Sequence, residues 1–519
     1  MNPTHNPSAI PPASFDPPAS IPGRAWWTIA LLLAAYVLLR CLYAPLMELS
    51  GDEAYYWTWS RCLAGGYLDH APMVAWVIRL GTMLIGNSEL GVRFPAALLS
   101  AGTIAAGIWL ASQITPILPA NNATALAAKP SRLHPAVVLT LLLLAFPLLH
   151  VLGAIITPDT PAVFFTTLAI GMALRCITRF AGLGSYVVLG IFCGLAMLSK
   201  YTSLVSVVSI LAVLLLHDRR RFGRIILAGL VACIVLWPML RWNYQHDWVS
   251  FRFQLRHGTN IGAHATATLL GMITTAAGNF ATFIGSQLLV GSPILAPLMI
   301  FNAYRALRSG HAPRRLLAIA GLVPLTLFAC TSILHKVEAN WTSQAYLPLL
   351  ILLFMDLPTY GQRFSKLYLA GIRVAAVSVL VLHIPPAILA RLAPGTSLAR
   401  IGGFRTLAAQ THTLAGNLPV VSTRYQDAGL LAFYLPGQPR VTILREPGDR
   451  VNQDTIAPAP LPPGEFLLIT DGGPTIGTTV PFFHGQESFP VDILSRQEIS
   501  AAPDNPRLHR NAIRAQRAQ

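Results

Sequence analysis

Two adjacent carboxylates, Asp52 and Glu53, directly follow an apolar run over residues 25–46 that is long enough to span a bilayer. Charged pairs at a membrane edge are costly to keep away from water and are not needed for anchoring. Either acid is suited to act as a general base on an acceptor hydroxyl, whereas the structural alternative is a helix N-cap. The residues around the pair suit a pocket for a polar, ring-shaped ligand, and they are Tyr55, Tyr56, Trp57, Trp59, Tyr67, Asp69 and His70.

A third acid, Asp159, lies in a rigid turn between Pro158 and Pro161, at the same predicted membrane depth as Asp52. An Asx-turn or a helix N-cap is its structural alternative. A phosphate group at this interface would need cations, although lysines there can also simply reach the head groups. The cations available on this side are Arg40, Lys200, Arg241, Arg252, Arg256 and Lys336.

Asp69 and His70 place a carboxylate next to an imidazole, and His257 follows in a later loop on the same side. Two or three distant ligands are weak support for a metal, and a capped turn before an amphipathic helix is the alternative. The sequence therefore demands no cofactor and leaves a divalent metal open.

The composition identifies a polytopic membrane protein. Of the 519 residues, 54% are hydrophobic and only 11% are charged, against about 25% charged residues in soluble domains. The net charge of +16 is spread over short connections between apolar runs, which argues against nucleic-acid binding. The six cysteines contain no CxxC pair, so neither a disulfide framework nor a zinc cluster is indicated.

Apolar segments recur along the chain and predict about eleven transmembrane helices. The predicted spans are 25–46, 94–113, 136–156, 161–178, 185–199, 201–217, 224–240, 281–303, 315–333, 345–357 and 367–389. Basic residues are more frequent in the connections on the side of the N-terminus, which makes that side cytoplasmic. Most acids fall on the opposite side, where we expect the chemistry.

The predicted domains follow from these patterns. Residues 1–24 form a disordered cytoplasmic N-terminus, and residues 25–390 form the transmembrane domain, whose first periplasmic loop (47–93) carries an amphipathic helix over 73–84. Residues 391–503 form a small periplasmic α/β domain, and 504–519 form a disordered basic tail. Within the α/β domain we expect strands over 418–422 and 465–470 and a helix over 426–433.

Four stretches together resemble bacterial GT-C glycosyltransferases, and most of all the dolichyl-phosphate-mannose-protein mannosyltransferase-like family. This group includes the aminoarabinose transferases that modify lipid A. Residues 424–427 and 432–435 are also similar to the family's outer domain. The four stretches are Asp52-Glu53-Ala54-Tyr55-Tyr56-Trp57, Gly66-Tyr67-Leu68-Asp69-His70-Ala71-Pro72-Met73, Thr157-Pro158-Asp159-Thr160-Pro161 and Lys336-Val337-Glu338-Ala339-Asn340-Trp341.

The resemblance implies a GT-C fold and a polyprenyl-phosphate sugar donor that is used on the periplasmic face of the bacterial inner membrane. It implies that Asp52 is the base candidate and that Asp159 shares its cavity, with Tyr56 and Tyr67 near the donor. Aminoarabinose transferases carry a Glu-Lys pair before Pro-Pro, where this chain reads Asp69-His70-Ala71-Pro72, so the sugar is not carried over. In some relatives a histidine of the fourth outer loop binds metal, and His257 is the nearest match.

The sequence therefore predicts a hexosyl- or pentosyltransferase that moves a sugar from a polyprenyl-phosphate donor to lipid A, another glycolipid or a protein. The alternatives are a non-catalytic lipid or sugar transporter or flippase and an inactive relative that acts as a receptor; no internal repeat supports a transporter. The predicted catalytic residues are Asp52, Asp159 and Glu53, the predicted substrate-binding residues are Arg40, Tyr55, Tyr56, Tyr67, His70, Lys200, Arg256, Lys336, Glu338 and Asn340, and the predicted metal ligands are Asp69 and His257.

Overall fold

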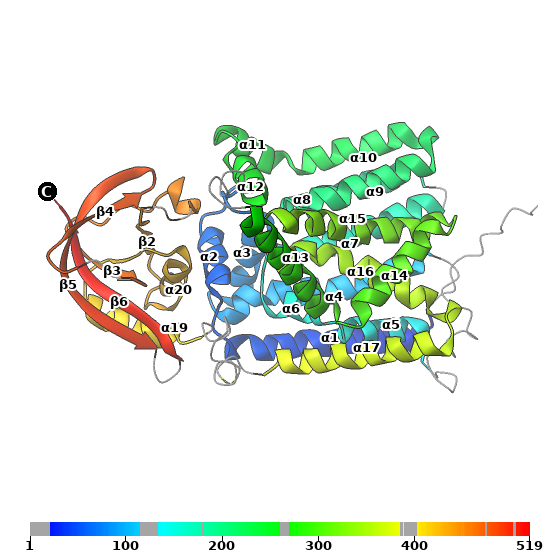
Figure 1. The fold of residues 1–519 in the computed structure, drawn as a ribbon, viewed down its shortest axis with the longest axis horizontal. Coiled ribbons are helices and arrows are strands. Elements are labelled where there is room, and N and C mark those ends of the chain that lie inside the picture. Colours follow the sequence, from blue (N-terminus) through cyan, green and yellow to red (C-terminus); the bar gives the residue numbers. More distant parts are fainter. Residues whose placement is uncertain are drawn as a thin grey trace, which may run out of the picture.

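The structure, a computed structural model, describes residues 21–114, 133–178, 181–259, 269–384, 388, 402–447, 449, 451–472, 475–501 and 505–518. A bundle of helices forms one part, and a sheet with two covering helices forms a C-terminal domain at one end of it (Figure 1). Disorder was predicted for residues 1–24: residues 1–20 lie outside the described ranges, so the prediction stands untested there, and it is wrong for Gly23 and Arg24, which begin α1.

The bundle is built from apolar helices that lie broadly side by side (Figure 1). Its elements are α1 Gly23–Tyr43, α4 Glu89–Ser112, α5 Pro135–Leu144, α6 Pro147–Ala154, α7 Asp159–Thr178, α8 Leu183–Ser199, α9 Ser203–His217, α10 Phe222–Val235, α11 Trp237–Gln245, α12 Val249–Thr259, α13 Leu269–Gly291, α14 Leu295–Arg308, α15 Ala312–Leu334, α16 Ser343–Asp356 and α17 Gln362–Leu382, with the 3₁₀ turns η1 Ala44–Leu46, η3 Arg219–Arg221, η4 Ala339–Thr342 and η5 Leu357–Thr359.

Five helices of the described residues are long and apolar enough to cross a membrane, and the number rises to eight if each of three bent pairs is one span. The eleven predicted spans are therefore not confirmed as a count. Exposed aromatic side chains at the ends of α1 and α11 match the aromatic belts of membrane proteins, because their rings favour the head-group region. Trp27 is 75% exposed and Tyr244 is 73% exposed.

Three of the predicted spans are broken rather than continuous. The predicted helix 136–156 divides before Pro147 with a bend of 64°, and the helix 224–240 bends by 55° next to Pro238. A proline ring removes a backbone donor and clashes with the preceding turn. The predicted helix 281–303 was wrong as a single element, because α13 and α14 meet at 94° across Ser292, whose φ is 67°.

The first loop folds into two helices, α2 Gly51–Ser60 and α3 Met73–Ile85, as the amphipathic pattern predicted for the second of them. A capping box starts α2: the Ser50 hydroxyl accepts from the Glu53 N–H, and the Glu53 carboxylate accepts from the Ser50 N–H. This cap places Asp52 in the first turn of α2, at the end of the bundle that faces the C-terminal domain.

The C-terminal domain holds a mixed six-stranded sheet with the order β2-β1-β3-β6-β5-β4. β1 pairs in parallel with β2 and β3, and the other neighbours are antiparallel. The elements are α19 Phe404–Ala415, β1 Val420–Ser422, α20 Tyr425–Tyr434, β2 Thr442–Ile443, the turn η7 Gln453–Thr455, β3 Glu465–Thr470, β4 Thr479–His484, β5 Glu487–Ala501 and β6 Asn505–Arg517. The two strands and the helix predicted for this region are present.

The predicted disordered tail is wrong for residues 505–517. These residues form β6, which lies between β3 and β5 in the sheet. Ile513 and Ala515 are fully buried, and Arg510 forms an ion pair with the buried Asp427. The many basic residues suggested a solvated tail, but β6 buries Leu508 and Ala512 in the core shared with the first loop and Ile513 and Ala515 in a second core of the domain.

The C-terminal domain shares one hydrophobic core with the first loop. Buried side chains of α2, such as Trp57, pack with α20 and with the inner face of the sheet, such as Leu467. Trp57 meets Phe433 edge to face at 5.0 Å between ring centroids. The two segments are far apart in sequence, but they stabilise one another.

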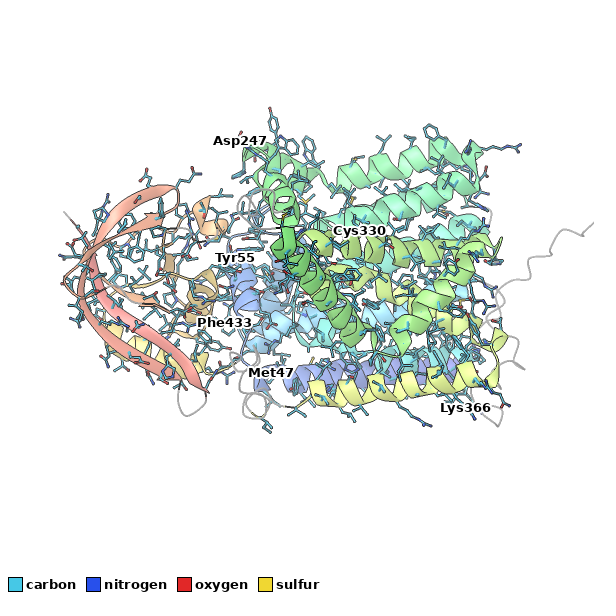
Figure 2. All side chains as sticks on the ribbon, viewed as in Figure 1. Met47, Tyr55, Asp247, Cys330, Lys366 and Phe433 are labelled. Atoms are coloured by element: carbon cyan, nitrogen blue, oxygen red, sulfur yellow. The ribbon has the colours of Figure 1, made fainter. Side chains whose placement is uncertain are left out.

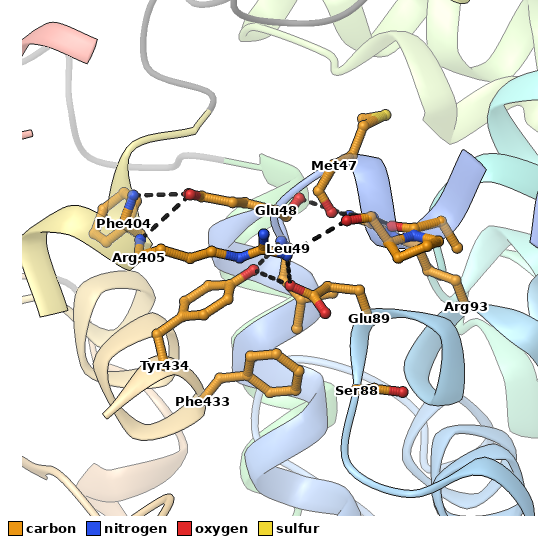
Figure 3. Close-up of polar contacts among 12 residues, drawn as sticks. Met47, Glu48, Leu49, Ser88, Glu89, Arg93, Phe404, Arg405, Phe433 and Tyr434 are labelled. Atoms are coloured by element: carbon orange, nitrogen blue, oxygen red, sulfur yellow. Dashed lines mark hydrogen bonds and ion pairs between the residues drawn. The ribbon is translucent and has the colours of Figure 1, made fainter. Parts of the chain in front are cut away.

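Polar contacts reinforce this junction (Figure 3). The Glu48 carboxylate accepts from the Phe404 N–H at 2.7 Å, at the N-terminus of α19, where a negative charge is favoured. The Tyr434 hydroxyl accepts from the Leu49 N–H at 2.7 Å and donates to Glu89, which also pairs with Arg405. The junction thus fixes the position of the first loop from both sides.

Candidate active site

A cavity of about 710 Å³ lies where the first loop, the ends of several helices and the C-terminal domain meet. Its volume is in the range of small-molecule sites. Figure 2 shows Tyr55, which lines it, at the end of the bundle next to the C-terminal domain, and Lys366 at the opposite end. The cavity has a polar end and an apolar wall. Its polar lining includes Asp52, Tyr55, Tyr56, Asp69, His70, Asp159, Lys200, Gln254, Glu338, Asn340 and Tyr425, and its apolar lining includes Met197, Leu204, Leu236, Met239, Leu240, Phe251, Phe253, Leu255, Leu327 and Phe328.

Asp159 is the first residue of α7 and is only 1% exposed. Its Oδ1 accepts from the Lys200 ammonium at 2.7 Å and from the Ser343 hydroxyl, and its Oδ2 accepts from the Asn340 amide at 2.7 Å. Lys200 also donates to the Asn340 carbonyl at 3.2 Å. Both oxygens of Asp159 are therefore occupied, and this acid is held as the counter-ion of a buried lysine.

Asp52 differs from Asp159 in its exposure. It lines the same cavity from the first turn of α2, and its side chain is exposed. A helix N-terminus favours a nearby negative charge, and the Asp52 carboxylate lies in that position. Asp52 and Asp159 were predicted to share a cavity, and both line it. Asp159 is hydrogen-bonded at both oxygens, whereas the Asp52 side chain is exposed.

Two tyrosines of α2, Tyr55 and Tyr56, line the cavity where the helical bundle meets the C-terminal domain. The Tyr55 hydroxyl donates to Asp69 at 2.8 Å and accepts from the Gln453 N–H of η7 at 2.7 Å. Burial, followed by the Asp69 charge, raises the pKa of Tyr55 well above its usual range. Burial likewise raises the pKa of Tyr56, whose ring meets His70 at 5.6 Å. Both phenols therefore stay neutral and can donate hydrogen bonds.

Glu53 does not line the cavity, so the structure gives no support to its predicted catalytic role. Its carboxylate is fully buried, forms two hydrogen bonds with the Arg93 guanidinium at 2.7 and 2.9 Å, and accepts from the Ile156 N–H. Arg93 in turn donates to the carbonyls of Met47 and Glu48. Glu53 is a structural residue that anchors the first loop to α4.

Arg40, a predicted substrate-binding residue, also lies away from the cavity. It is 4% exposed, bonds to His150 and to His383, which follows α17, and lies over the Tyr36 ring. The sequence indicated correctly that a buried arginine needs partners, but the partners are two imidazoles rather than a ligand in the cavity.

Tyr67 and Lys336, two further predicted substrate-binding residues, do not line the cavity. The Tyr67 ring stacks on Trp59 at 4.5 Å, its hydroxyl bonds to backbone groups of the first loop, and burial raises its pKa to about 12. Lys336 is an exposed side chain that pairs with Glu338 at 3.0 Å, and only Glu338 of the two lines the cavity.

Arg256 and His257 belong to α12, but their side chains lie outside the part of the chain that the structure describes. Among the described residues, no three His, Cys, Asp or Glu side chains come together as metal ligands. The metal alternative with Asp69 and His257 therefore gains no support and stays a prediction.

Residues beyond the predicted ones also contribute to the site: Gln254 and Tyr425 line the cavity, and Ser343 acts beside it through Asp159. Ser343 bonds to Asp159, and its spacing of three from Asn340 was the available signal, because such residues share a face of a tight helical turn. The Gln254 amide donates to the Asp69 carbonyl. Tyr425 comes from the C-terminal domain, and sequence spacing gave no indication that it would reach the cavity.

Comparisons with known proteins agree with this fold. Residues 69–242 match the family model described as dolichyl-phosphate-mannose-protein mannosyltransferase, a range that includes Asp69, Asp159 and Lys200. The lipid A galacturonosyltransferase RgtD of Rhizobium johnstonii is 29% identical over 308 residues. That alignment covers 57% of this chain and 58% of RgtD, so it spans less than two thirds of the relative.

Two solved structures share the fold at 15% identity. ArnT from Cupriavidus metallidurans in the apo state has a TM-score of 0.56, with 86% of this chain and 93% of that chain covered. The same protein bound to undecaprenyl phosphate has a TM-score of 0.60, with 95% and 98% covered. The comparisons confirm the resemblance to bacterial GT-C glycosyltransferases, and the chain is a membrane protein with an ArnT-like fold.

Proposed function

We propose that the protein transfers a sugar from a polyprenyl-phosphate donor to a lipid acceptor at the periplasmic face of the bacterial inner membrane. The observation that carries this proposal is the composition of the cavity. A lysine paired with a buried acid and an accessible carboxylate lie at its polar end, and an apolar wall continues from there. A lipid phosphate sugar has the same division into a charged head and an apolar tail.

Lys200 is the group that stabilises the leaving phosphate. In the transfer step the acceptor oxygen bonds to the anomeric carbon while the bond from that carbon to the phosphate oxygen breaks. The electron pair leaves with the polyprenyl phosphate, whose added charge is stabilised by a preorganised cation. Lys200 is held by the Asp159 carboxylate and the Asn340 carbonyl. Asp159 is held in turn by the Asn340 amide and the Ser343 hydroxyl.

Asp52 is the group that we assign to the acceptor. If the acceptor is a hydroxyl, the Asp52 carboxylate takes its proton as the new bond forms. If it is a lipid phosphate, no strong base is needed and Asp52 positions the reacting groups. The names of the relatives support a lipid acceptor: RgtD is described as acting on lipid A, and ArnT has been solved with undecaprenyl phosphate.

The test is mass spectrometry of envelope lipids from a deletion strain complemented with wild type, Asp52→Asn or Asp247→Asn. Asp247 is an exposed acid that does not line the cavity, so it is the matched control. We expect one sugar-sized lipid adduct to return with wild type and Asp247→Asn and to fall by about 10²-fold or more with Asp52→Asn. Equal adduct with Asp52→Asn would refute the assigned role, and redistribution of an unmodified lipid without any adduct would favour a flippase.

A further inference from the structure

The C-terminal domain contains a second, polar cavity of about 260 Å³. It lies at the carboxyl ends of the parallel strands β1 and β3 and beside the segment that follows β2: Thr423 and Arg424 follow β1, Arg445 follows β2, and Asp471 follows β3. In open sheets with parallel strands, ligands bind in the crevice outside these carboxyl ends. The position in the fold therefore matches that of a binding site.

The lining of this cavity offers donors and acceptors in similar number. Two arginines and three acids line it, so it is not a simple anion site. Arg445 donates from its Nη atoms to the carbonyls of Asp449 and Gly485, while its buried Nε has no partner among the described residues. Arg424, the N-cap residue of α20, forms an ion pair with Asp471, which also pairs with Arg510.

The second cavity adjoins the first through one residue. Tyr425 lines both of them. The start of α20 is pressed against the start of α2, since a Cβ added at Gly51 would lie 2.6 Å from the Gln426 Cβ. A molecule in the second cavity would therefore contact Tyr425, which also lines the first.

A sugar ring matches this chemistry better than phosphate does. Each hydroxyl both donates and accepts, so it is satisfied by neighbouring carboxylates, guanidinium groups and backbone N–H groups together. The volume is below the range of about 300–1,000 Å³ that is usual for drug-sized ligands and suits one ring. Carboxylates such as Glu446 and Asp449 would instead repel a phosphate.

We propose that this second cavity binds a sugar ring of the acceptor's head group while the bond is formed in the first cavity. The proposal rests on the proposed function, because it takes the acceptor to be a glycolipid. The C-terminal domain then selects the acceptor, and the bundle holds the donor.

Gly472 allows a matched pair of variants. It lines the second cavity, and a Cβ added there meets no atom within 4 Å, so larger side chains have room to enter. Gly472→Phe would fill the cavity, and Gly472→Ala would leave most of it open. The first measurement is saturation-transfer NMR on the purified full chain in detergent, with methyl glucoside, glucosamine and inorganic phosphate as probes.

We expect one of the sugars to receive saturation from wild type and Gly472→Ala and at least tenfold less from Gly472→Phe, with no competition by inorganic phosphate. Equal transfer in both variants, or binding of phosphate alone, would overturn the proposal. The folding of Gly472→Phe is checked by its melting temperature and by retained binding of undecaprenyl phosphate.

A second measurement separates this proposal from the proposed function. In a transfer assay with the purified full chain and varied concentrations of each lipid, Gly472→Phe should raise the acceptor KM about tenfold and leave the donor KM unchanged. If Gly472→Phe loses sugar binding while Asp52→Asn transfers sugar at the wild-type rate, the second cavity is a sugar site and the proposed function is refuted. Transfer that depends on Asp52 without any sugar binding would refute the second cavity alone.

Discussion

Asp52 and Asp159 show how one residue type takes two different environments within one cavity. Asp159 is surrounded by a lysine, an amide and a hydroxyl, while Asp52 is exposed on a helix N-terminus. The sequence placed both acids at the same membrane depth. It did not indicate that Asp159 would pair with Lys200, because that pairing depends on how α7, α8 and η4 pack.

The ion pair between Asp159 and Lys200 predicts a large effect of removing one partner. Lys200→Met should destabilise the fold by about 3–5 kcal/mol, because it leaves an uncompensated buried carboxylate. It should also weaken binding of undecaprenyl phosphate. Thermal unfolding in detergent and a lipid-binding titration measure the two effects.

The double variant Asp159→Asn with Lys200→Met is the control for charge burial. It removes both charges, so most of the stability should return while binding of undecaprenyl phosphate stays weak. Recovery of binding together with stability would show that Lys200 has only a structural role and would contradict its assignment to the leaving phosphate.

At the scale of elements, the pairing of α2 with α20 positions the site. Gly429 of α20 lies against the backbone of α2, and a Cβ there would be 2.9 Å from the Ala54 carbonyl carbon and from the Tyr55 nitrogen. Gly429→Ala should therefore push the helices apart, destabilise the protein by about 1–3 kcal/mol and lower transfer. The melting temperature and the adduct yield provide the readout.

The matched control for this close approach is Gly229→Ala in α10, where an added Cβ meets no atom within 4 Å. There the substitution should stabilise the helix by about 0.5–1 kcal/mol through backbone entropy. A Gly429→Ala variant as stable as Gly229→Ala would contradict the tight packing of α2 on α20.

Local elements were predictable where one pattern dominated. The short apolar run over 465–470 predicted β3, which is buried on both faces, and the amphipathic pattern over 73–84 predicted α3. The break between α13 and α14 and the strand β6 were not predicted. Both depend on neighbours distant in sequence: β6 gains its order from pairing with β3 and β5 rather than from its own composition.

The site was predictable in its motif residues and less so in its partners. Nine of the predicted residues line the cavity; Glu53, Arg40, Tyr67 and Lys336 do not. Glu53 was adjacent to Asp52 in sequence, but successive residues of a helix point about 100° apart, so one faces the cavity and the other faces Arg93. The nine residues that line the cavity are Asp52, Tyr55, Tyr56, Asp69, His70, Asp159, Lys200, Glu338 and Asn340.

At the scale of the whole molecule, the junction between the bundle and the C-terminal domain contains an acid with an altered pKa. Burial raises the pKa of Asp454 in η7 to about 6; Arg440 opposes this shift and the charge of Asp69 adds to it. The neighbouring Gln453 bonds to Tyr55 and to the Leu68 N–H, so this turn holds the first loop.

The raised pKa of Asp454 predicts a pH dependence of stability. An unfolded aspartate has a pKa of about 3.9, so the folded protein binds the proton more tightly. The stabilisation is complete below about pH 4 and is lost as the pH rises to about 6. Asp454→Asn should remove this fall, so its melting temperature should exceed that of wild type by more at pH 7 than at pH 4.5.

Glu465→Gln, which alters an exposed acid on β3, is the control for general effects of charge removal. It should change the melting temperature by the same amount at both pH values. If the difference in melting temperature between Asp454→Asn and wild type does not vary with pH, the raised pKa of Asp454 is contradicted.

The most direct test of the central claim, transfer from a polyprenyl-phosphate donor, follows donor and acceptor together. Purified full chain is added to membranes of the deletion strain, and mass spectrometry follows the polyprenyl-phosphate sugar, free polyprenyl phosphate and the modified lipid over time. The account predicts that wild type forms one polyprenyl phosphate for each lipid adduct and that Asp52→Asn forms neither. Adduct formation without release of polyprenyl phosphate, or equal rates for both proteins, would contradict it.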